Sequence, residues 1–110
     1  ISRKCDFDKL KRDGKKLKIA DFAFVSFLSN RDFGVRCAWT VPKYCGTAVL
    51  RNRLKRLCRT AVREAPEFLN NNVDINIVFK RAEPRFYKEM KLNEFKKYLY
   101  PVFERIKRSV

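Results

Sequence analysis

One stretch, residues 48–64 (AVLRNRLKRLCRTAVRE), constrains the fold more than any other, because it combines apolar residues at helical spacing with dense positive charge. At about 100° per residue, a helix here would gather its apolar residues on one side. These residues are Leu50, Leu54, Leu57, Cys58 and Ala61. The period therefore predicts a helix over the stretch, with this side buried against a core.

The other side of the same helix would be almost purely cationic. It carries Asn52, Lys55, Arg56, Arg59 and Arg63, with Arg51 and Arg53 near the edges of the apolar stripe. Basic residues often simply solvate an exposed helix. Such faces usually mix signs, however, with an acid four residues before a base. Only Glu64 interrupts the positive charge here, so we interpret this side as a surface for a polyanion, with nucleic acid as the first candidate.

The whole chain is also basic, with 27 Lys and Arg against 12 Asp and Glu, or +15 on 110 residues. Such a charge predicts strong, salt-dependent attraction to phosphate. Hydrophobic residues make up 45% of the chain, which permits one domain over residues 1–110 with a modest core. No apolar run reaches the roughly 18 residues of a membrane span, and no signal peptide precedes the basic start. We therefore expect a soluble, cytoplasmic domain without a membrane partner.

Cysteine and histidine usage argues against a metal or catalytic site in the chain. Cys5, Cys37, Cys45 and Cys58 are irregularly spaced, and we interpret them as free thiols and not as two disulfides. There is no Cys-x-x-Cys pair and no histidine for a zinc site or for a general base near neutral pH. The aspartates are scattered, and three glycines are too few for a phosphate loop. The residues indicate binding chemistry alone.

The patterns along the chain predict the order helix, strand, strand, helix, strand, helix, an α+β two-layer sandwich. A short helix or helical turn spans residues 3–13 and ends at Gly14. The Phe-rich run 22–28 is typical of a strand. A polar turn at residues 29–33 then predicts that the next strand, residues 34–41, pairs antiparallel to the first. Alternation in this second strand predicts one buried face and one more open face.

The second half of the chain continues the alternation of helix and strand. Thr47 is the expected N-cap of the central helix, and Gly46 before it indicates a backbone shape that a Cβ would hinder. Residues 73–79 (VDINIVF) are apolar enough for a strand in the middle of the sheet. Residues 86–108 return to helical spacing, and we expect Pro101 to interrupt or kink that helix.

The loop and the central helix together resemble a known family. Residues 40–64, TVPKYCGTAVLRNRLKRLCRTAVRE, are similar to the signature of the bacterial ribonuclease P protein component, the small basic subunit that joins a catalytic RNA. Three further segments keep register with the same family. They are residues 4–15 (KCDFDKLKRDGK), the Phe-rich strand and residues 74–81 (DINIVFKR). The resemblance covers nearly the whole chain, and the Arg-Asn-Arg core at residues 51–53 is its most specific part.

The resemblance implies an endoribonuclease holoenzyme that removes the 5′ leader of precursor tRNA, with hydrolysis by RNA-bound magnesium and no catalytic residue in this chain. It also implies a left-handed crossover between parallel strands, an exception to the usual hand. Contacts with the catalytic RNA carry over to Arg51, Asn52, Arg53, Lys55, Arg56, Arg59 and Lys43. Contacts with the leader carry over to Phe7, Lys11, Val25 and Phe27, in a cleft between the first helix and the opposite face of the sheet.

Some positions depart from the family pattern. Lys11 stands where relatives often have a second aromatic residue, Val25 where tyrosine can occur, and Tyr44 where lysine is common, so leader contact is expected to depend more on charge than on stacking. Phe7 fits equally well as a docking residue for the first helix or as a ring that stacks on a base. Four other functions remain as alternatives to a ribonuclease P subunit. They are a ribosomal or RNA-chaperone protein, a DNA-binding protein, a helix that binds a lipid surface, and a nuclease that needs no RNA subunit.

Overall fold

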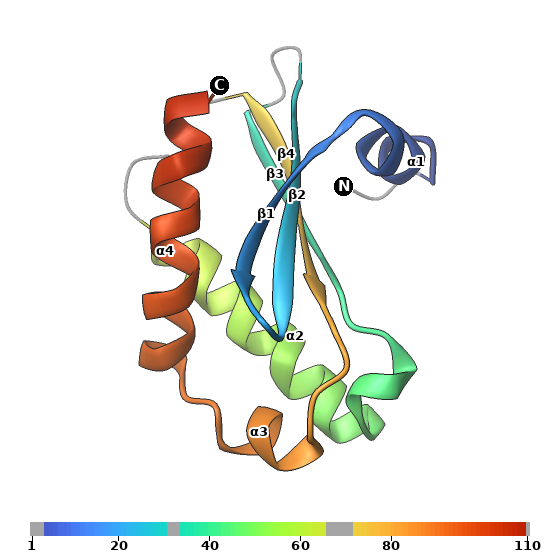
Figure 1. Ribbon diagram of the computed structural model, residues 1–110, viewed down its shortest axis with the longest axis vertical. Helices are drawn as coiled ribbons and strands as arrows, with labels where there is room; N and C mark the ends of the chain where they lie inside the picture. Colours follow the sequence, from blue (N-terminus) through green and yellow to red (C-terminus); the bar gives the residue numbers. More distant parts are fainter. Residues whose placement is uncertain (1–3, 31–33, 66–71, 110) are drawn as a thin grey trace.

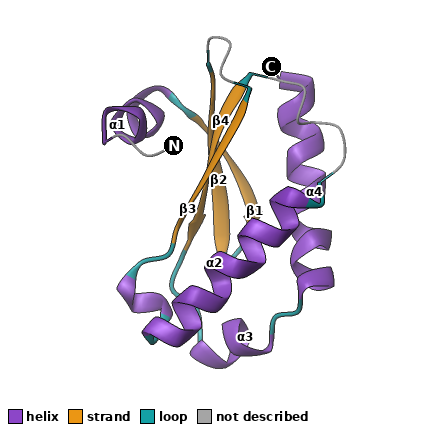
Figure 2. Ribbon diagram, turned by 180° about the vertical axis from the view of Figure 1, so that it is seen from behind, coloured by secondary structure: helices purple, strands orange, loops and turns teal. Residues whose placement is uncertain are grey.

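The computed structural model describes residues 4–30, 34–65 and 72–109. Its strands form one mixed sheet in the order β1-β2-β4-β3, and they are β1 (Lys15–Ala20), β2 (Ala23–Ser29), β3 (Val35–Thr40) and β4 (Val73–Phe79). The helical elements are α1 (Lys4–Asp13), η1 (Lys43–Cys45), α2 (Ala48–Arg63), α3 (Pro84–Glu89) and α4 (Leu92–Ser109). α2 and α4 cover one face of the sheet, whereas α1 lies on the other side (Figures 1 and 2). The α+β class predicted from the sequence is confirmed.

The core lies between the sheet and the helix pair α2 and α4. The strands contribute Ala23, Val25, Phe27, Val73, Ile75, Ile77 and Phe79, all buried. The helices contribute Leu50, Leu54, Cys58, Ala61, Phe95, Leu99 and Ile106, also buried. Burying one large apolar side chain stabilises a fold by about 1.5–3 kcal/mol, so the helices depend on this sheet for their stability. The predicted apolar side of the central helix is confirmed.

The pairing of β3 differs from the sequence prediction. β4 pairs antiparallel with β2 and parallel with β3, so β4 separates the two strands that were expected to be neighbours. The predicted antiparallel pairing of β2 with β3 was therefore wrong. The turn residues favour a reversal of the chain, but they do not determine which strand lies next to β2 in the sheet. The core face of β4 is entirely apolar and buried, which suits the middle of the sheet. The predicted central position of this strand is confirmed, and the hand of the crossover stays a prediction.

Strand β1 was missed in the sequence pattern. Its sequence KKLKIA is rich in lysine, and it pairs antiparallel with β2 at the edge of the sheet. Lysines on an edge strand discourage pairing with a second protein chain. This role explains why the composition of β1 does not resemble that of an ordinary strand. The turn at residues 31–33 and the residues between Ala65 and Asn72 lie outside the described residues.

The start of α2 is determined by the two residues before it. The Leu50 amide N–H donates to Thr47 Oγ1 at 3.2 Å, which confirms Thr47 as the N-cap. Gly46 has a φ of 141°, and a Cβ at this position would lie 2.6 Å from Leu50 Cδ2. Glycine is therefore required there both for its backbone conformation and for the close approach of the helix.

The C-terminal helical region is divided at a different place from the one expected. Met90 is buried and extended, with a ψ of 123°, and it separates α3 from α4. α4 continues through Pro101, so the predicted interruption there was wrong. A proline inside a helix costs about 3 kcal/mol. Pro101 is exposed, and its neighbours Leu99, Val102 and Phe103 are buried in the core, which offsets that cost.

Three of the four cysteines fall among the side chains that the structure describes. Cys37, Cys45 and Cys58 are free thiols, as predicted, whereas the side chain of Cys5 lies outside the described set. Burial raises the pKa of Cys37 to about 11 and raises that of Cys58 further. Both thiols therefore stay protonated and unreactive at neutral pH.

An ion pair joins the two parallel strands on the face away from α2. Arg36 Nε and Nη2 donate to the two carboxylate oxygens of Asp74, each at 2.7 Å, and Asn30 Nδ2 donates to the same carboxylate at 2.8 Å. Burial alone would raise the pKa of Asp74, but these hydrogen bonds outweigh burial and hold the pKa below its usual value. The charged form of Asp74 is thus part of the folded structure.

We expect Asp74→Asn to lower the free energy of unfolding at neutral pH by about 1–3 kcal/mol, the range for hydrogen bonds to charged groups. The folded pKa of Asp74 is depressed, so its stabilisation is complete above the unfolded pKa of about 4 and is lost as pH falls through the folded value. Denaturant unfolding of both proteins from pH 7 to pH 2.5 should show the difference shrinking below about pH 4. A difference that stays constant over this range would contradict the assignment.

Candidate nucleic-acid interface

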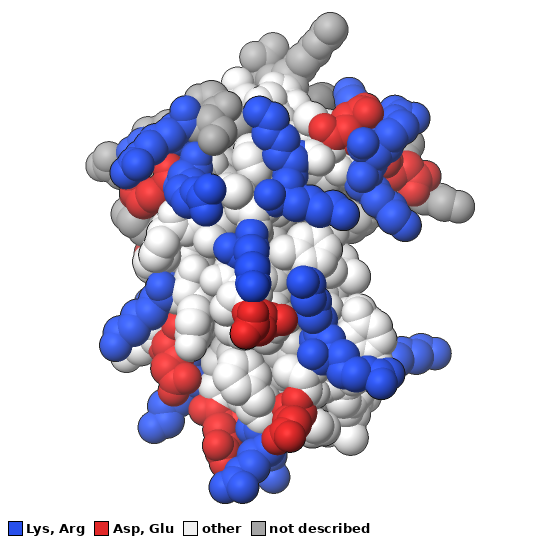
Figure 3. Space-filling view, in the orientation of Figure 1, with Lys and Arg blue, Asp and Glu red and all other residues white. Residues whose placement is uncertain are grey.

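The outer side of α2 is a basic surface, as the sequence predicted. Asn52, Arg56, Arg59 and Arg63 are exposed, and Arg51, Arg53 and Lys55 are half-buried along its edges. The helix lies in front of the sheet in Figure 2, with this side directed away from the core. Figure 3, which views the opposite side of the molecule, shows Lys and Arg side chains spread over that face as well, with fewer acidic side chains among them.

Two arginines of the Arg-Asn-Arg core are directed partly into the protein. Arg53 Nη2 donates to the main-chain oxygen of Met90 at 2.6 Å, so Arg53 links α2 to the α3–α4 connection. Its Nη1 atom and the Nε atom of Arg51 are buried and have no hydrogen-bond partner among the described residues. Arg53 was expected as an RNA contact at the edge of the apolar stripe, and this geometry gives it a structural role in addition.

Aromatic rings position other cations at the edges of the basic helix. The guanidinium of Arg59 lies 6.0 Å from the ring centroid of Trp39 in β3. Lys43 and Tyr44 are exposed on η1, and the Arg81 guanidinium lies 5.5 Å from the Tyr44 ring centroid. Cation–π contacts of this kind restrain long side chains at little cost. Lys43 is thus an exposed cation on η1, the element that precedes α2, and its contact with RNA stays a prediction.

A cleft lies on the other face of the sheet, between α1 and the strands. Its volume is about 330 Å³, and its lining consists of Phe7, Asp8, Leu10, Lys11, Lys16, Phe24, Ser26, Thr40, Asn76 and Val78. Leu10 is 2% exposed and anchors α1, whereas Phe7 is only half-buried. Phe7 and Lys11, both predicted for a leader cleft, thus lie together in this cavity.

Val25 and Phe27 do not lie in the cleft, which corrects the sequence prediction. They are 0% and 3% exposed and point into the core beneath α2 and α4. The prediction was displaced by one position along β2, and a displacement of one residue moves a side chain to the opposite face of a sheet. Phe24 and Ser26 are the β2 residues that line the cleft.

The sequence did contain a signal for the correct face. β2 is apolar on both faces, so its own alternation is weak, but β4 alternates clearly between apolar and polar residues. Asp74 and Asn76 pair in register with Leu28 and Ser26 of β2, and paired residues share a face. Once β4 is known to pair with β2, the polar positions of β4 identify the cleft side of β2.

Phe24 is the functional candidate that the sequence reasoning missed. Its ring is half-buried in the cleft, with Lys16 Nζ 5.4 Å and Lys80 Nζ 5.6 Å from the ring centroid. An accessible aromatic ring next to two ammonium groups can stack on a base while the cations attract the neighbouring phosphates. The cleft therefore combines both parts of single-strand recognition.

The described residues contain neither a cluster of metal ligands nor a helix suited to span a membrane. They contain no group of three or more His, Cys, Asp or Glu side chains that could hold a metal ion. Within the same ranges, no helix is both long enough and apolar enough to cross a membrane.

The geometry defines a class of protein: a small basic α+β protein with a cationic helix on one side of its sheet and an aromatic, lysine-lined cleft on the other. The family model described as Ribonuclease P matches residues 1–107. The chain therefore belongs to the ribonuclease P protein family, whose members take part in tRNA processing as components of an endoribonuclease.

Known relatives agree with this assignment. The chain is 42% identical to the ribonuclease P protein component of Maridesulfovibrio salexigens over 74% of this chain and 67% of that protein. It is 31% identical to the protein component of Desulforapulum autotrophicum, covering 99% of this chain and 89% of the relative. Among solved structures, an RNase P protein from Thermotoga maritima superposes with a TM-score of 0.85 at 22% identity, covering 96% of this chain and 97% of that one. This last similarity supports the fold.

Proposed function

We propose that this chain assists an RNA-catalysed, magnesium-dependent reaction in the cytoplasm, the endonucleolytic removal of the 5′ leader from precursor tRNA. In this proposal α2 and η1 bind the catalytic RNA, and the cleft beside α1 binds the leader. The observation that carries it is the arrangement of two different nucleic-acid surfaces on opposite faces of one sheet. A protein with this arrangement can contact a folded RNA and a single strand simultaneously.

The basic helix suits the first of these tasks. Arg56 and Arg59 are exposed on α2, and a guanidinium can bind a phosphate with two parallel hydrogen bonds. Lys43, Arg51, Asn52, Arg53 and Lys55 complete the set that we propose for the catalytic RNA. Folded RNA is recognised mainly through its shape and its phosphates, which matches a surface of cations with few acids.

The cleft suits the second task, because it has rings for bases and lysines for phosphates. Phe7 and Phe24 supply the rings, and Lys11 and Lys16 supply positive charge. Stacking tolerates every base, so such a cleft can accept leaders of different sequence. The expectation that charge would dominate over stacking is revised here, because Phe24 supplies a second ring.

Magnesium belongs to the RNA subunit in this proposal. The described side chains form no cluster of three ligands, so they do not fit a metal site built by the protein alone. The tasks that remain for the chain are to bind, to orient the substrate and to reduce repulsion between two polyanions. A net charge of +15 suits the last of these.

Phe7→Ala tests the leader part of the proposal. We expect it to weaken holoenzyme binding to leader-bearing precursor tRNA by roughly 5- to 150-fold, because one stacked base contributes about 1–3 kcal/mol. Binding of mature tRNA, which lacks the leader, should change little. Equilibrium binding of both RNAs to holoenzymes with each protein measures the two effects, and equal losses for the two RNAs would contradict a leader cleft.

A further inference from the structure

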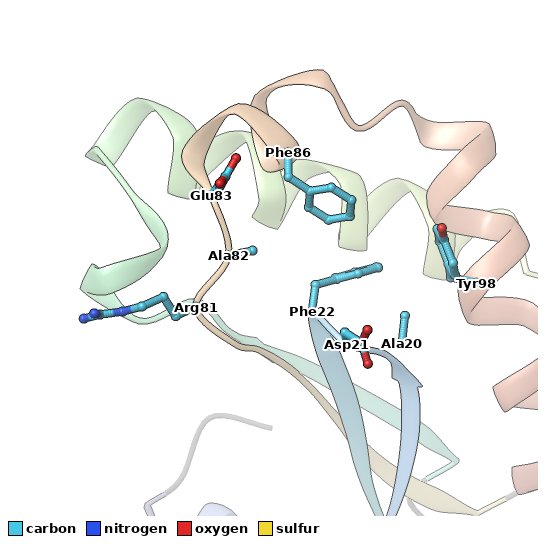
Figure 4. A pocket seen from close by; sticks show the side chains of 8 residues that line it. All are labelled: Ala20, Asp21, Phe22, Arg81, Ala82, Glu83, Phe86 and Tyr98. Atoms are coloured by element: carbon cyan, nitrogen blue, oxygen red, sulfur yellow. The ribbon is translucent and has the colours of Figure 1, made fainter.

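A second pocket lies at the end of the sheet away from α1, between the β1–β2 turn, α3 and α4 (Figures 1 and 4). Its volume is about 430 Å³, and it is lined by Ala20, Asp21, Phe22, Arg81, Ala82, Glu83, Phe86 and Tyr98. The proposed function uses none of these residues.

Three aromatic rings form one wall of the pocket. The ring of Phe22 is 5% exposed, and its centroid lies 5.2 Å from that of Phe86 and 5.3 Å from that of Tyr98. Phe86 and Tyr98 themselves remain 40% and 43% exposed. Figure 4 shows the Phe22 ring between the other two, with Phe86 contributed by α3 and Tyr98 by α4. Accessible rings around a concavity can stack on a planar ligand.

The charges around the pocket indicate which planar ligand fits. Asp21 and Glu83 are lining residues on different sides of the Phe22 ring (Figure 4), and the Asp21 side chain is 99% exposed. Carboxylates repel phosphate but accept hydrogen bonds from an amino group, so each can accept only from a base that enters on its own side. Asp21 also pairs with Lys18 at 2.9 Å, and Glu83 makes no capping hydrogen bond to α3. The Arg81 side chain extends away from the aromatic rings in Figure 4, so it can meet a phosphate outside the pocket.

We propose that this pocket binds an unpaired nucleobase of an RNA and prefers a base that carries an exocyclic amino group. The exposed rings stack on the base, one of the two carboxylates accepts a hydrogen bond from its amino group, and Arg81 binds the adjoining phosphate. The proposal rests on the RNA-binding part of the proposed function, but it uses a surface separate from both α2 and the leader cleft.

The pocket and the cleft are close enough for one strand to reach both. The Lys80 amide N–H donates to the main-chain oxygen of Phe22 at 2.7 Å, and the ammonium group of the same lysine lies 5.6 Å from the Phe24 ring centroid. Lys80 therefore contacts one lining residue of each site, Phe22 of the pocket and Phe24 of the cleft. The base can come from the leader or from the catalytic RNA, since both would offer the same chemistry.

The first test compares labelled oligocytidine and oligouridine of equal length, binding to the free protein at fixed salt. Both carry the same phosphates, but only cytosine has an exocyclic amino group. Wild-type protein should bind oligocytidine about 5- to 10-fold more tightly, the lower end of the range for a good base contact, because a single hydrogen bond is expected here. The double variant Asp21→Ala, Glu83→Ala should bind the two within about twofold, and Tyr98→Ala should weaken both.

Val49→Ala is the control, because Val49 is 80% exposed, lies outside the pocket and is not among the residues proposed to contact RNA. It should preserve the preference for oligocytidine. Equal wild-type affinities for the two oligonucleotides would overturn the proposal. A preference for oligocytidine that persists in the Asp21 and Glu83 double variant would also overturn it. The same holds if the protein shows no base preference and Tyr98 is instead required for self-association.

The second test identifies the source of the base with Tyr98→Ala in the holoenzyme. A loss confined to leader-bearing precursor tRNA would assign the base to the leader, and a loss confined to assembly would assign it to the catalytic RNA. No loss in either would overturn the proposal. A negative result for Phe7→Ala would count against the leader cleft alone, because the comparison of oligocytidine with oligouridine does not depend on it.

Discussion

Replacing Arg56 and Arg59 together with alanine is expected to weaken assembly with ribonuclease P RNA by about 10- to 100-fold at physiological salt. Both side chains are exposed on α2, and neither is required by the core. Each lost phosphate contact removes one released counterion, so the slope of log affinity against log salt should fall by about 1.5–2. Titrations at several salt concentrations measure this slope. An unchanged slope would remove both arginines from the interface.

Arg53→Ala provides the internal comparison, because Arg53 donates to the Met90 carbonyl and holds the α3–α4 connection against α2. We expect this change to lower the free energy of unfolding by about 1–3 kcal/mol, the cost of losing a hydrogen bond from a charged donor. The double variant of Arg56 and Arg59 should lose at most about 0.5–1 kcal/mol, the value of the contact between Arg59 and the Trp39 ring. Arg53→Ala could instead leave stability unchanged and lower the salt slope as much per residue as the Arg56 and Arg59 double variant. Arg53 would then contact only the RNA and would have no structural role.

Phe24→Ala is expected to weaken precursor binding, whereas Phe27→Ala is expected to destabilise the fold, although the two residues are only three positions apart. Phe27 is 3% exposed in the core, so its loss should lower the free energy of unfolding by about 3–5 kcal/mol. Phe24 lines the cleft and is half-buried, so its loss should affect stability less. It should weaken holoenzyme binding to leader-bearing precursor by about 5- to 150-fold, the value of one stacked base.

Denaturant unfolding and precursor binding separate these two effects. Mature tRNA serves as the substrate control, because it has no leader to occupy the cleft. If Phe24→Ala left precursor binding unchanged, the cleft would not be the leader site. If Phe27→Ala were well tolerated by the fold, the assignment of faces in β2 would be wrong.

Local sequence signals predicted those parts of the fold that depend on local chemistry. The limits of α2 follow from its helical period and from the Thr47 cap, and both are confirmed in the structure. The apolar side of α2 follows from the same period, and its residues Leu50, Leu54, Cys58 and Ala61 are buried. Each of these features depends on side chains within a few positions of one another.

The parts that could not be predicted depend on contacts between distant segments. The position of β4 between β2 and β3 arises from long-range pairing, which a turn pattern does not determine. The cleft side of β2 follows only once that pairing is known, and this is why Val25 and Phe27 were placed on the wrong face. The hydrogen bond from Arg53 to Met90 spans 37 positions, so nothing near Arg53 in the sequence predicts it.

Cleavage of 5′-labelled precursor tRNA at low magnesium tests the central claim most directly. The reaction is run with this protein alone, with a bacterial ribonuclease P RNA alone, and with both. The account predicts cleavage at the mature 5′ end only when both are present. Tight RNA binding with no gain in cleavage would favour a ribosomal or chaperone role, and cleavage by the protein alone would show that the chain contains a catalytic site.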